Sequence, residues 1–203
     1  MKVLWDVDTQ VDFMLPEGKL YVPGAEATAP AMKRLVEAAR AAGVVHVASA
    51  DDHELTDSEI SEHPDYSTTY PPHCLRGTRG ARKIPETEQE DPVPMTLEPL
   101  PEHYITGREF LLLKKSFDVF TNPNTERLLE LLDPDEIVVF GVATDVCDAA
   151  AIRAFLERGR KVVFVQDAAR GLDEGRVRSC TRTWREAGVE LTTADRVISS
   201  FAG

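Results

Sequence analysis

Three residues of this chain have the side chains that an activated thiol needs: Asp8, Lys114 and Cys147. A thiol is a useful nucleophile only as the thiolate, so it needs a proton acceptor and a nearby cation or helix N-terminus. Asp8 follows one apolar run, Lys114 ends another, and Cys147 precedes a helical pattern. Taken singly, each also fits an ordinary role: a turn cap, a solvated strand end or a small core residue. Lys115 is the alternative cation.

Five apolar runs rich in β-branched residues alternate with helical patterns along the chain. Glycines follow three of these helical patterns, as is typical of helix ends. The alternation predicts one doubly wound α/β domain over residues 1–203, Rossmann-like and three-layered, with helices on both faces of a mainly parallel sheet. Its active site is expected beyond the carboxyl ends of the strands. The predicted strands are 2–7, 44–50, 110–114, 137–140 and 162–165, and the predicted helices are 29–42, 125–132, 148–158 and 176–187.

The stretch from 51 to 102 interrupts this alternation, because it is long, rich in Pro and acidic residues, and without clear periodicity. Long loops of this kind are usually functional or disordered. Its first half concentrates His, Asp, Tyr and Cys, so we expect part of the site there. The second half, residues 85–102, is predicted to be a lid or a mobile insertion.

Composition excludes several classes of function. The 203 residues carry a formal net charge of -12, which disfavours binding to nucleic acid. No run approaches the roughly 20 apolar residues of a membrane span, and aspartates interrupt the first apolar stretch where a secretory signal would need a continuous one. Three scattered cysteines do not make a disulfide framework. We therefore expect a cytoplasmic protein with a small-molecule substrate.

Several spaced motifs, in the same order, resemble those of isochorismatase-like cysteine hydrolases. The segment VDTQVDF is similar to the family's D-x-Q-x-D-F, KKSFDVF to K-x-x-[YF]-S-x-F, and GVATDVC to G-x-x-[TS]-x-x-C-V. The resemblance continues through AAIRAFLERGRKVVFVQDAARG and so spans nearly the whole chain. Two departures stand out: Asp148 replaces the apolar residue after the cysteine, and Asp118 replaces a serine.

The resemblance implies a role for each of the first three residues. It makes Cys147 the nucleophile, Asp8 the general acid and base, and Lys114 the neighbouring cation, with Lys114 preferred over Lys115 because of its spacing from Phe120. It also implies an oxyanion hole from the backbone N–H groups of Ala143 and Cys147, with a cis peptide before Ala143. A homo-oligomer is implied as well.

A possible metal site links the chain to the nicotinamidase branch of that family. Asp51-Asp52-His53 resembles the D-x-H motif of nicotinamidases, and YPPHC, which contains His73, resembles their W-P-x-H-C segment. Asp51, His53 and His73 offer one oxygen and two nitrogens, which suits Zn²⁺, Fe²⁺ or Mn²⁺ with open positions. Glu62 is a weaker further candidate. The remaining histidines and cysteines, together with GTRGAR at 77–82, are expected to be structural: His46, His63, His103, Cys74 and Cys180.

The expected activity is hydrolysis of nicotinamide to nicotinate and ammonia through a thioester, in NAD salvage, with zinc the first choice of metal and Phe13 beside the ring. One alternative is a metal-free family amidase that acts on a carbamoyl or ureido compound. Isochorismatase proper is less favoured, because its dianionic substrate suits a strongly acidic protein poorly. A non-catalytic binding module on the same fold is the third alternative.

Overall fold

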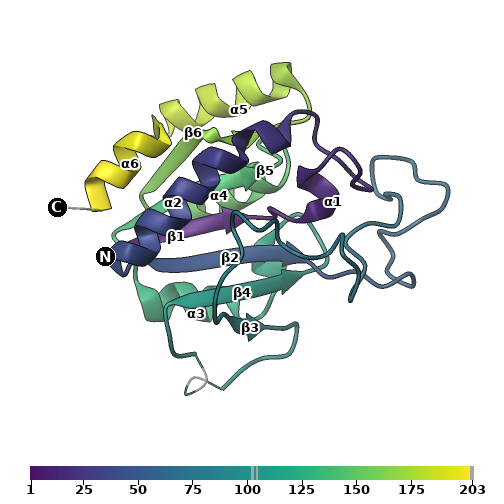
Figure 1. Cartoon of the computed structure of the whole chain (residues 1–203), viewed down its shortest axis with the longest axis horizontal. Helices are drawn as coiled ribbons and strands as arrows, with labels where there is room; N and C mark the ends of the chain where they lie inside the picture. Colours follow the sequence, from purple (N-terminus) through teal and green to yellow (C-terminus); the bar gives the residue numbers. More distant parts are fainter. Residues whose placement is uncertain (102, 104, 202–203) are drawn as a thin grey trace.

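Parallel strands form the centre of the molecule (Figure 1). The computed structural model describes residues 1–101, 103 and 105–201, and within them seven strands form one sheet in the order β3-β4-β2-β1-β5-β6-β7. All six strand pairings are parallel, so every carboxyl end meets the same edge of the sheet. The strands are β1 (Lys2–Val7), β2 (Val45–Asp51), β3 (Val93–Met95), β4 (Glu109–Lys114), β5 (Glu136–Val142), β6 (Val162–Arg170) and β7 (Glu190–Thr192).

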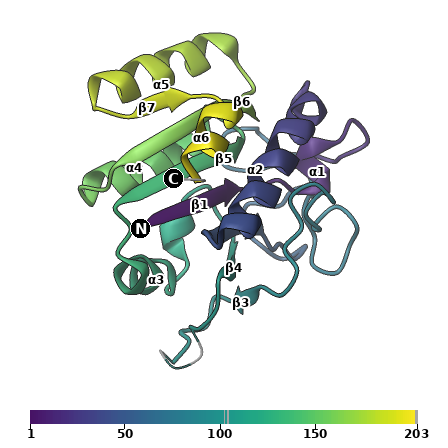
Figure 2. The same ribbon diagram turned by 60° about the vertical axis from the view of Figure 1, so that its left-hand side comes forward.

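Helices cover both faces of this sheet, as Figures 1 and 2 show together. The central strand β1 explains the layering, because its side chains alternate between the two faces. Trp5 meets Phe155 of α4 with ring centroids 4.7 Å apart, whereas Leu4 packs in the other core with Met32 and Leu35 of α2. The helices are α1 (Val11–Met14), α2 (Ala29–Ala42), α3 (Thr125–Leu132), α4 (Cys147–Glu157), α5 (Glu174–Glu186) and α6 (Ala194–Phe201), with short 3₁₀ turns η1 (Ala25–Thr28) and η3 (Val119–Thr121).

The predicted doubly wound α/β fold is confirmed, with differences at its margins. Strands β5 and β6 run further toward the site than predicted, and helices α4 and α5 begin one and two residues earlier. Sequence periodicity missed four short elements, β3, β7, α1 and α6, because three to eight residues give too few turns or alternations to stand out. Within the described residues, no helix has the length and apolarity to cross a membrane.

The predicted lid over residues 85–102 was wrong for the part that the structure describes. This segment contributes β3 to the edge of the sheet, and its Thr87 and Met95 are fully buried. The side-chain amide of Gln89 donates hydrogen bonds to the backbone carbonyls of His46 and Phe110, at 2.9 and 3.2 Å. The segment therefore closes the sheet edge, which its Pro-rich and acidic composition did not indicate. Glu102, its last residue, lies outside the described residues.

One buried acid in the first turn of α4 stands out because no ion pair among the described residues compensates it and Thr144 only partly offsets the rise in its pKa. The side chain of Asp148 is fully buried, and neither of its oxygens has a hydrogen-bond partner among the described residues. Burial raises the pKa of Asp148 well above its usual range, and the neighbouring carboxyls of Asp8 and Asp6 raise it further. A buried carboxyl in such a setting holds its proton instead of ionising.

We expect Asp148→Asn to stabilise the protein at high pH. Above the ordinary carboxyl pKa the unfolded chain loses this proton while the folded protein keeps it, so stability falls as the pH rises toward the raised folded pKa. Asparagine does not ionise, so the variant avoids this loss of stability. Its free energy of unfolding should exceed that of the parent protein by about 1–3 kcal/mol at pH 8 and differ little near pH 4. Urea unfolding across this pH range measures the difference, with the exposed Glu157→Gln on the same helix as control. A pH dependence identical to that of the parent protein would contradict this account.

Candidate functional site

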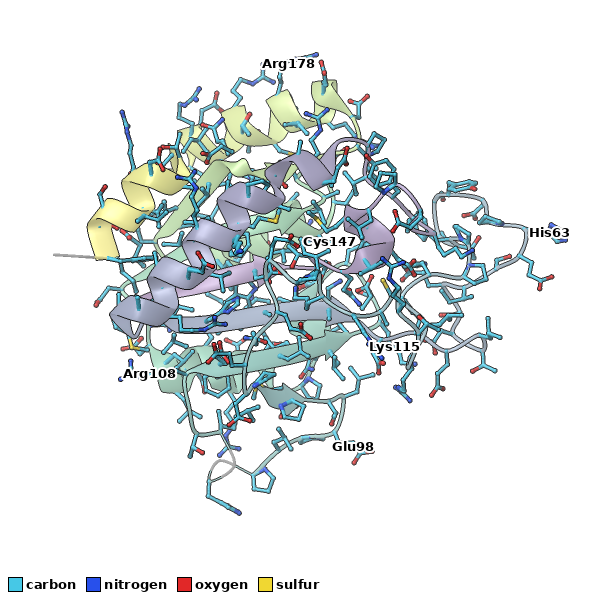
Figure 3. The ribbon with its side chains drawn as sticks, viewed as in Figure 1. His63, Glu98, Arg108, Lys115, Cys147 and Arg178 are labelled. Atoms are coloured by element: carbon cyan, nitrogen blue, oxygen red, sulfur yellow. The ribbon has the colours of Figure 1, made fainter. Side chains whose placement is uncertain are left out.

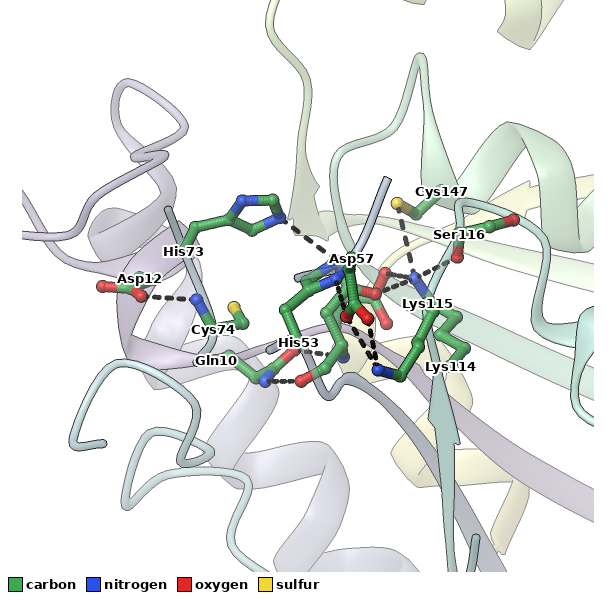
Figure 4. Close-up of polar contacts among 12 residues, drawn as sticks. Gln10, Asp12, His53, Asp57, His73, Cys74, Lys114, Lys115, Ser116 and Cys147 are labelled. Carbon is green, nitrogen blue, oxygen red and sulfur yellow. Dashed lines mark hydrogen bonds and ion pairs between the residues drawn. The ribbon is translucent and has the colours of Figure 1, made fainter. Parts of the chain in front are cut away.

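The three residues predicted to activate a thiol meet at the carboxyl edge of the sheet. Asp8 directly follows β1, Lys114 ends β4, and Cys147 begins α4. The Nζ atom of Lys114 lies 2.8 Å from Asp8 Oδ2 and 4.0 Å from Cys147 Sγ, and it also forms an ion pair with Asp51. Figure 4 shows Lys114 turned toward Cys147 and toward the carbonyl of Ser116, which accepts a hydrogen bond of 2.9 Å.

The neighbouring Lys115 points to different partners. Its Nζ pairs with the carboxylate of Asp57 at 2.7 and 2.8 Å (Figure 4). Because strand side chains alternate between faces, only one of two adjacent lysines could enter the cluster. In the structure Lys114, and not Lys115, lies beside Cys147.

Charges in this cluster alter the proton affinity of its members. Burial raises the pKa of the Cys147 thiol well above its usual range; Lys114 opposes the shift, and Asp8 and Asp51 add to it. Burial also raises the pKa of Asp8, against the opposing field of Lys114. Burial alone would lower the pKa of Lys114, but Asp51 and Asp8 reverse this and raise it. The resting cluster therefore holds a neutral thiol beside a protonated lysine and a carboxyl group with increased proton affinity.

The backbone at Asp8 places its carboxyl group in the cluster. Asp8 has a φ of 51°, a left-handed conformation that turns the chain sharply at the end of β1. Its amide donates to the carbonyl of Ser49 on the adjacent strand at 3.2 Å, and the Ser49 hydroxyl donates to Asp8 Oδ1 at 2.7 Å. Ser49 therefore occupies one carboxylate oxygen while Lys114 binds the other.

A second group of side chains lies next to this cluster and could hold a metal ion. One donor atom each from Asp51, His53 and His73 lie within 4.8 Å of one another, and all three residues are buried. The Nε2 atoms of His53 and His73 are 3.8 and 3.7 Å from Asp51 Oδ2. His53 Nε2 is a buried nitrogen with no hydrogen-bond partner among the described residues, so it is available to a metal ion.

The other ring nitrogens of these histidines are engaged, which orients both rings. His73 Nδ1 is 2.8 Å from the carbonyl of Pro71, and His53 Nδ1 is 3.2 Å from Asp57 Oδ2. Hydrogen bonds at Nδ1 are the usual way in which proteins fix metal-binding histidines with Nε2 directed at the ion. Asp57 thereby links His53 to Lys115, a connection that sequence motifs did not indicate.

The weaker candidate Glu62 is not part of this donor group. Glu62 is exposed, whereas Glu59 is half-buried and within the electrostatic field of the site. Burial and Asp51 raise the pKa of Glu59, and the two histidines lower it. His63 projects from the tip of the same loop, far from Cys147 (Figure 3), while His46 is buried with Nε2 3.7 Å from Asp6. Neither histidine belongs to the group.

Gln10 and Asp12 bind the long loop to the rest of the site. Gln10 accepts from the amide of Asp51 at 2.7 Å and donates to the carbonyls of Asp51 and Ala81, both at 2.8 Å. Asp12 accepts from the amide of Cys74 at 2.7 Å, and a Cβ on Gly80 would lie 2.2 Å from its carboxylate. The GTRGAR loop therefore closes tightly against Asp12, in agreement with its expected structural role. Cys74 is fully buried beside it.

A cavity of about 410 Å³ opens over Cys147 and the donor group. Phe13, Tyr70 and Phe117 give it an aromatic lining, and Phe13 stands 5.5 Å from the ring of His73. Both Ala143 and Cys147, the expected oxyanion-hole residues, line the cavity, and the peptide between Val142 and Ala143 is cis. The sequence motifs did not identify the remaining lining residues: Leu20, Val22, Tyr66, Val146, Leu172 and Arg176.

Comparison with known proteins places this arrangement in a family. The model of the isochorismatase domain matches residues 3–196. The nicotinamidase/pyrazinamidase of Mycobacterium tuberculosis is 29% identical over 194 residues, covering 94% of this chain and 98% of that protein. The zinc complex of the Pyrococcus horikoshii pyrazinamidase superposes with a TM-score of 0.76 at 21% identity, covering 95% of this chain and 98% of that one.

The shared fold extends to relatives with other substrates. The N-carbamoylsarcosine amidase of Thermoplasma acidophilum superposes with a TM-score of 0.72 at 21% identity, covering 96% of both chains. At such identities the structures show a common fold and no more, because one fold hosts several reactions. The family-model match covers nearly the whole chain and contains every predicted catalytic and metal-ligating position, so this protein belongs to the isochorismatase family.

Proposed function

We propose that this protein is a metal-assisted cysteine amidohydrolase that converts nicotinamide to nicotinate and ammonia. The observation that carries the proposal is the position of Asp51, which contacts Lys114 of the thiol cluster and faces both histidines of the donor group. A ligand in the cavity over Cys147 is therefore beside both groups at once. The nicotinamidases of Mycobacterium tuberculosis and Escherichia coli, 29% and 27% identical to this chain, support the choice of substrate.

In the proposed reaction, Asp8 accepts the proton of Cys147 as the sulfur attacks the amide carbon. The raised pKa of Asp8 makes its carboxylate a stronger proton acceptor, and the raised pKa of Cys147 keeps the thiol protonated before the attack. Lys114 balances the charge on the sulfur. Backbone N–H groups of Ala143 and Cys147 stabilise the oxyanion, each such donor being worth about 3 kcal/mol of barrier.

Collapse of that intermediate breaks the carbon–nitrogen bond, and Asp8 gives its proton to the leaving ammonia. The ionised Asp8 then removes a proton from water, and the resulting hydroxide attacks the thioester carbonyl. As the carbon–sulfur bond breaks, Asp8 returns this proton to the sulfur, which releases the carboxylic acid and restores the Cys147 thiol. One carboxyl group thus works as base and acid in turn. Its two contacts, with Ser49 and Lys114, hold it in place through the cycle.

Asp51, His53 and His73 would hold a divalent metal ion, with zinc the first choice because two imidazoles and one carboxylate leave an open position for a ligand nitrogen. We propose Glu59 in place of Glu62 as a further ligand, since it is half-buried and electrostatically coupled to all three residues. A bound metal supplies a fixed positive charge that orients a pyridine nitrogen. Phe13 and Phe117 would flank the ring.

Three earlier expectations remain predictions in this proposal. A cytoplasmic location and a role in NAD salvage follow from the proposed activity and the free thiols of Cys74, Cys147 and Cys180. A homo-oligomeric state is expected from the family resemblance.

Replacement of the nucleophile tests the covalent mechanism. Cys147→Ala should reduce ammonia release from nicotinamide by at least about 10³-fold with an unchanged circular-dichroism spectrum, because no other group can form the thioester. Cys180→Ala removes a half-buried thiol on α5 and should retain the parent rate. Near-normal turnover by the Cys147→Ala protein would exclude the covalent route.

Removal of one proposed metal ligand tests the donor group. His73→Ala should lower bound metal, measured by elemental analysis after dialysis, from roughly one ion per chain to less than about one tenth of that, because a two-ligand site binds weakly. His63→Ala, at the exposed loop tip, should retain the metal. Chelation should stop ammonia release by the parent protein, and zinc should restore it. Full activity in a metal-free protein would favour the metal-free carbamoyl or ureido amidase instead.

A further inference from the structure

The cavity over Cys147 has a cationic side chain at its rim that the proposed reaction does not use. Arg176, in the first turns of α5, lines the cavity together with Cys147 and Leu172. Its side chain is 61% exposed, and Leu172 beside it is 49% exposed, whereas Cys147 is 7% exposed. Arg176 therefore lies at the open end of the cavity, whereas the thiol lies in its buried part.

A buried carboxylate holds this arginine in place. Arg176 Nε donates to Asp145 Oδ2 at 2.9 Å, and the Asp145 side chain is completely buried. Asp145 also accepts from the backbone amides of Leu172 and Asp173, at 2.7 and 3.2 Å. Since Asp145 lies two residues before Cys147, the guanidinium group is fixed relative to the nucleophile.

The rest of the guanidinium group has free donors. Within the described part of the chain, hydrogen bonds and ion pairs engage only its Nε atom and leave both Nη nitrogens available. Among the described cavity-lining residues Arg176 is the one arginine or lysine, in a chain of formal net charge -12.

The size of the cavity leaves room for a larger ligand than a single-ring amide. Its volume of about 410 Å³ falls in the range of pockets that hold ligands of several rings or long substituents, roughly 300–1,000 Å³. Leu20, Val22 and Leu172 contribute apolar surface to the same cavity. A ligand with its amide at Cys147 could therefore extend toward the rim.

The geometry points to Arg176 as a specificity-determining residue that binds a carboxylate on the substrate, distal to the amide that Cys147 attacks. This inference rests on the proposed function and extends its substrate class from nicotinamide to heteroaromatic amides that also carry an anionic group. Two parallel Nη donors match the two oxygens of a carboxylate, and the pairing with Asp145 pre-organises the guanidinium group, which reduces the entropy lost on binding.

Ligand binding to the Cys147→Ala protein tests this assignment without turnover. The ligands are nicotinamide, nicotinamide with a ring carboxylate meta to the amide, and the analogue with an uncharged hydroxymethyl group at the same carbon. Isothermal titration calorimetry should show that the carboxylate ligand binds about 10- to 100-fold more tightly than the hydroxymethyl ligand. Arg176→Gln in the same background should remove that difference and leave the affinity for the two uncharged ligands unchanged.

Arg178→Gln is the matched control. It removes the same charge from the same helix, but Arg178 extends outward, away from Cys147 (Figure 3), and pairs with Glu174. This control should retain the preference for the carboxylate ligand. If both variants weaken it equally, the effect is long-range electrostatics and the assignment is overturned.

The remaining outcomes separate this inference from the proposed function. The inference is overturned if the carboxylate ligand does not bind or if the two substituted ligands bind equally well. It is also overturned if Arg176→Gln weakens the binding of all three ligands equally, which would indicate a purely structural arginine. Arg176-dependent binding of the carboxylate ligand, with no ammonia release from nicotinamide by the parent protein, would support the subsite and reject nicotinamide as the substrate.

Discussion

The ammonium group of Lys114 is the interaction on which the site depends. It is buried between the carboxylates of Asp8 and Asp51 and lies 4.0 Å from the sulfur of Cys147. Two carboxylates this close to a thiol would repel one another without the cation, and a buried lysine without them would lose its proton. The two carboxylates therefore stabilise the charge of Lys114, and Lys114 stabilises the charge of each of them.

This interaction also couples the two halves of the site. Asp51 binds Lys114 through one oxygen and faces His53 and His73 with the other, so the chemistry of the thiol and the position of the donor group cannot vary independently. Lys114 lowers the pKa of Asp51 despite its burial, and the two histidines add to this. An ionised Asp51 is the form that a metal ion requires. Gln10 also holds Asp51 in place, because its side chain forms hydrogen bonds with both the amide and the carbonyl of the Asp51 backbone.

Two residues near Cys147 have no role in the proposed reaction. Asp148 introduces a buried, unpartnered carboxyl group beside the nucleophile, at a cost in stability at neutral pH. Arg176 introduces a cation at the rim of a cavity whose wall is otherwise aromatic and aliphatic, with the metal-site donors at its base. Relatives of different specificity share the fold, so such lining residues decide which amide is accepted.

The sequence determined the strand and helix alternation, the parallel sheet, and the candidates Asp8, Lys114, Cys147, Asp51, His53 and His73, because periodicity and motif spacing are local properties of the chain. It could not place Ser49, Asp57 or Arg176, whose contacts with Asp8, Lys115 and Asp145 join segments far apart in sequence and follow no local pattern. The same reason explains the failed lid: Gln89 and Met95 are buried through pairing with a distant strand edge. Tertiary structure alone decided what surrounds the thiol, since burial and electrostatic fields depend on distance in space, not on separation along the chain.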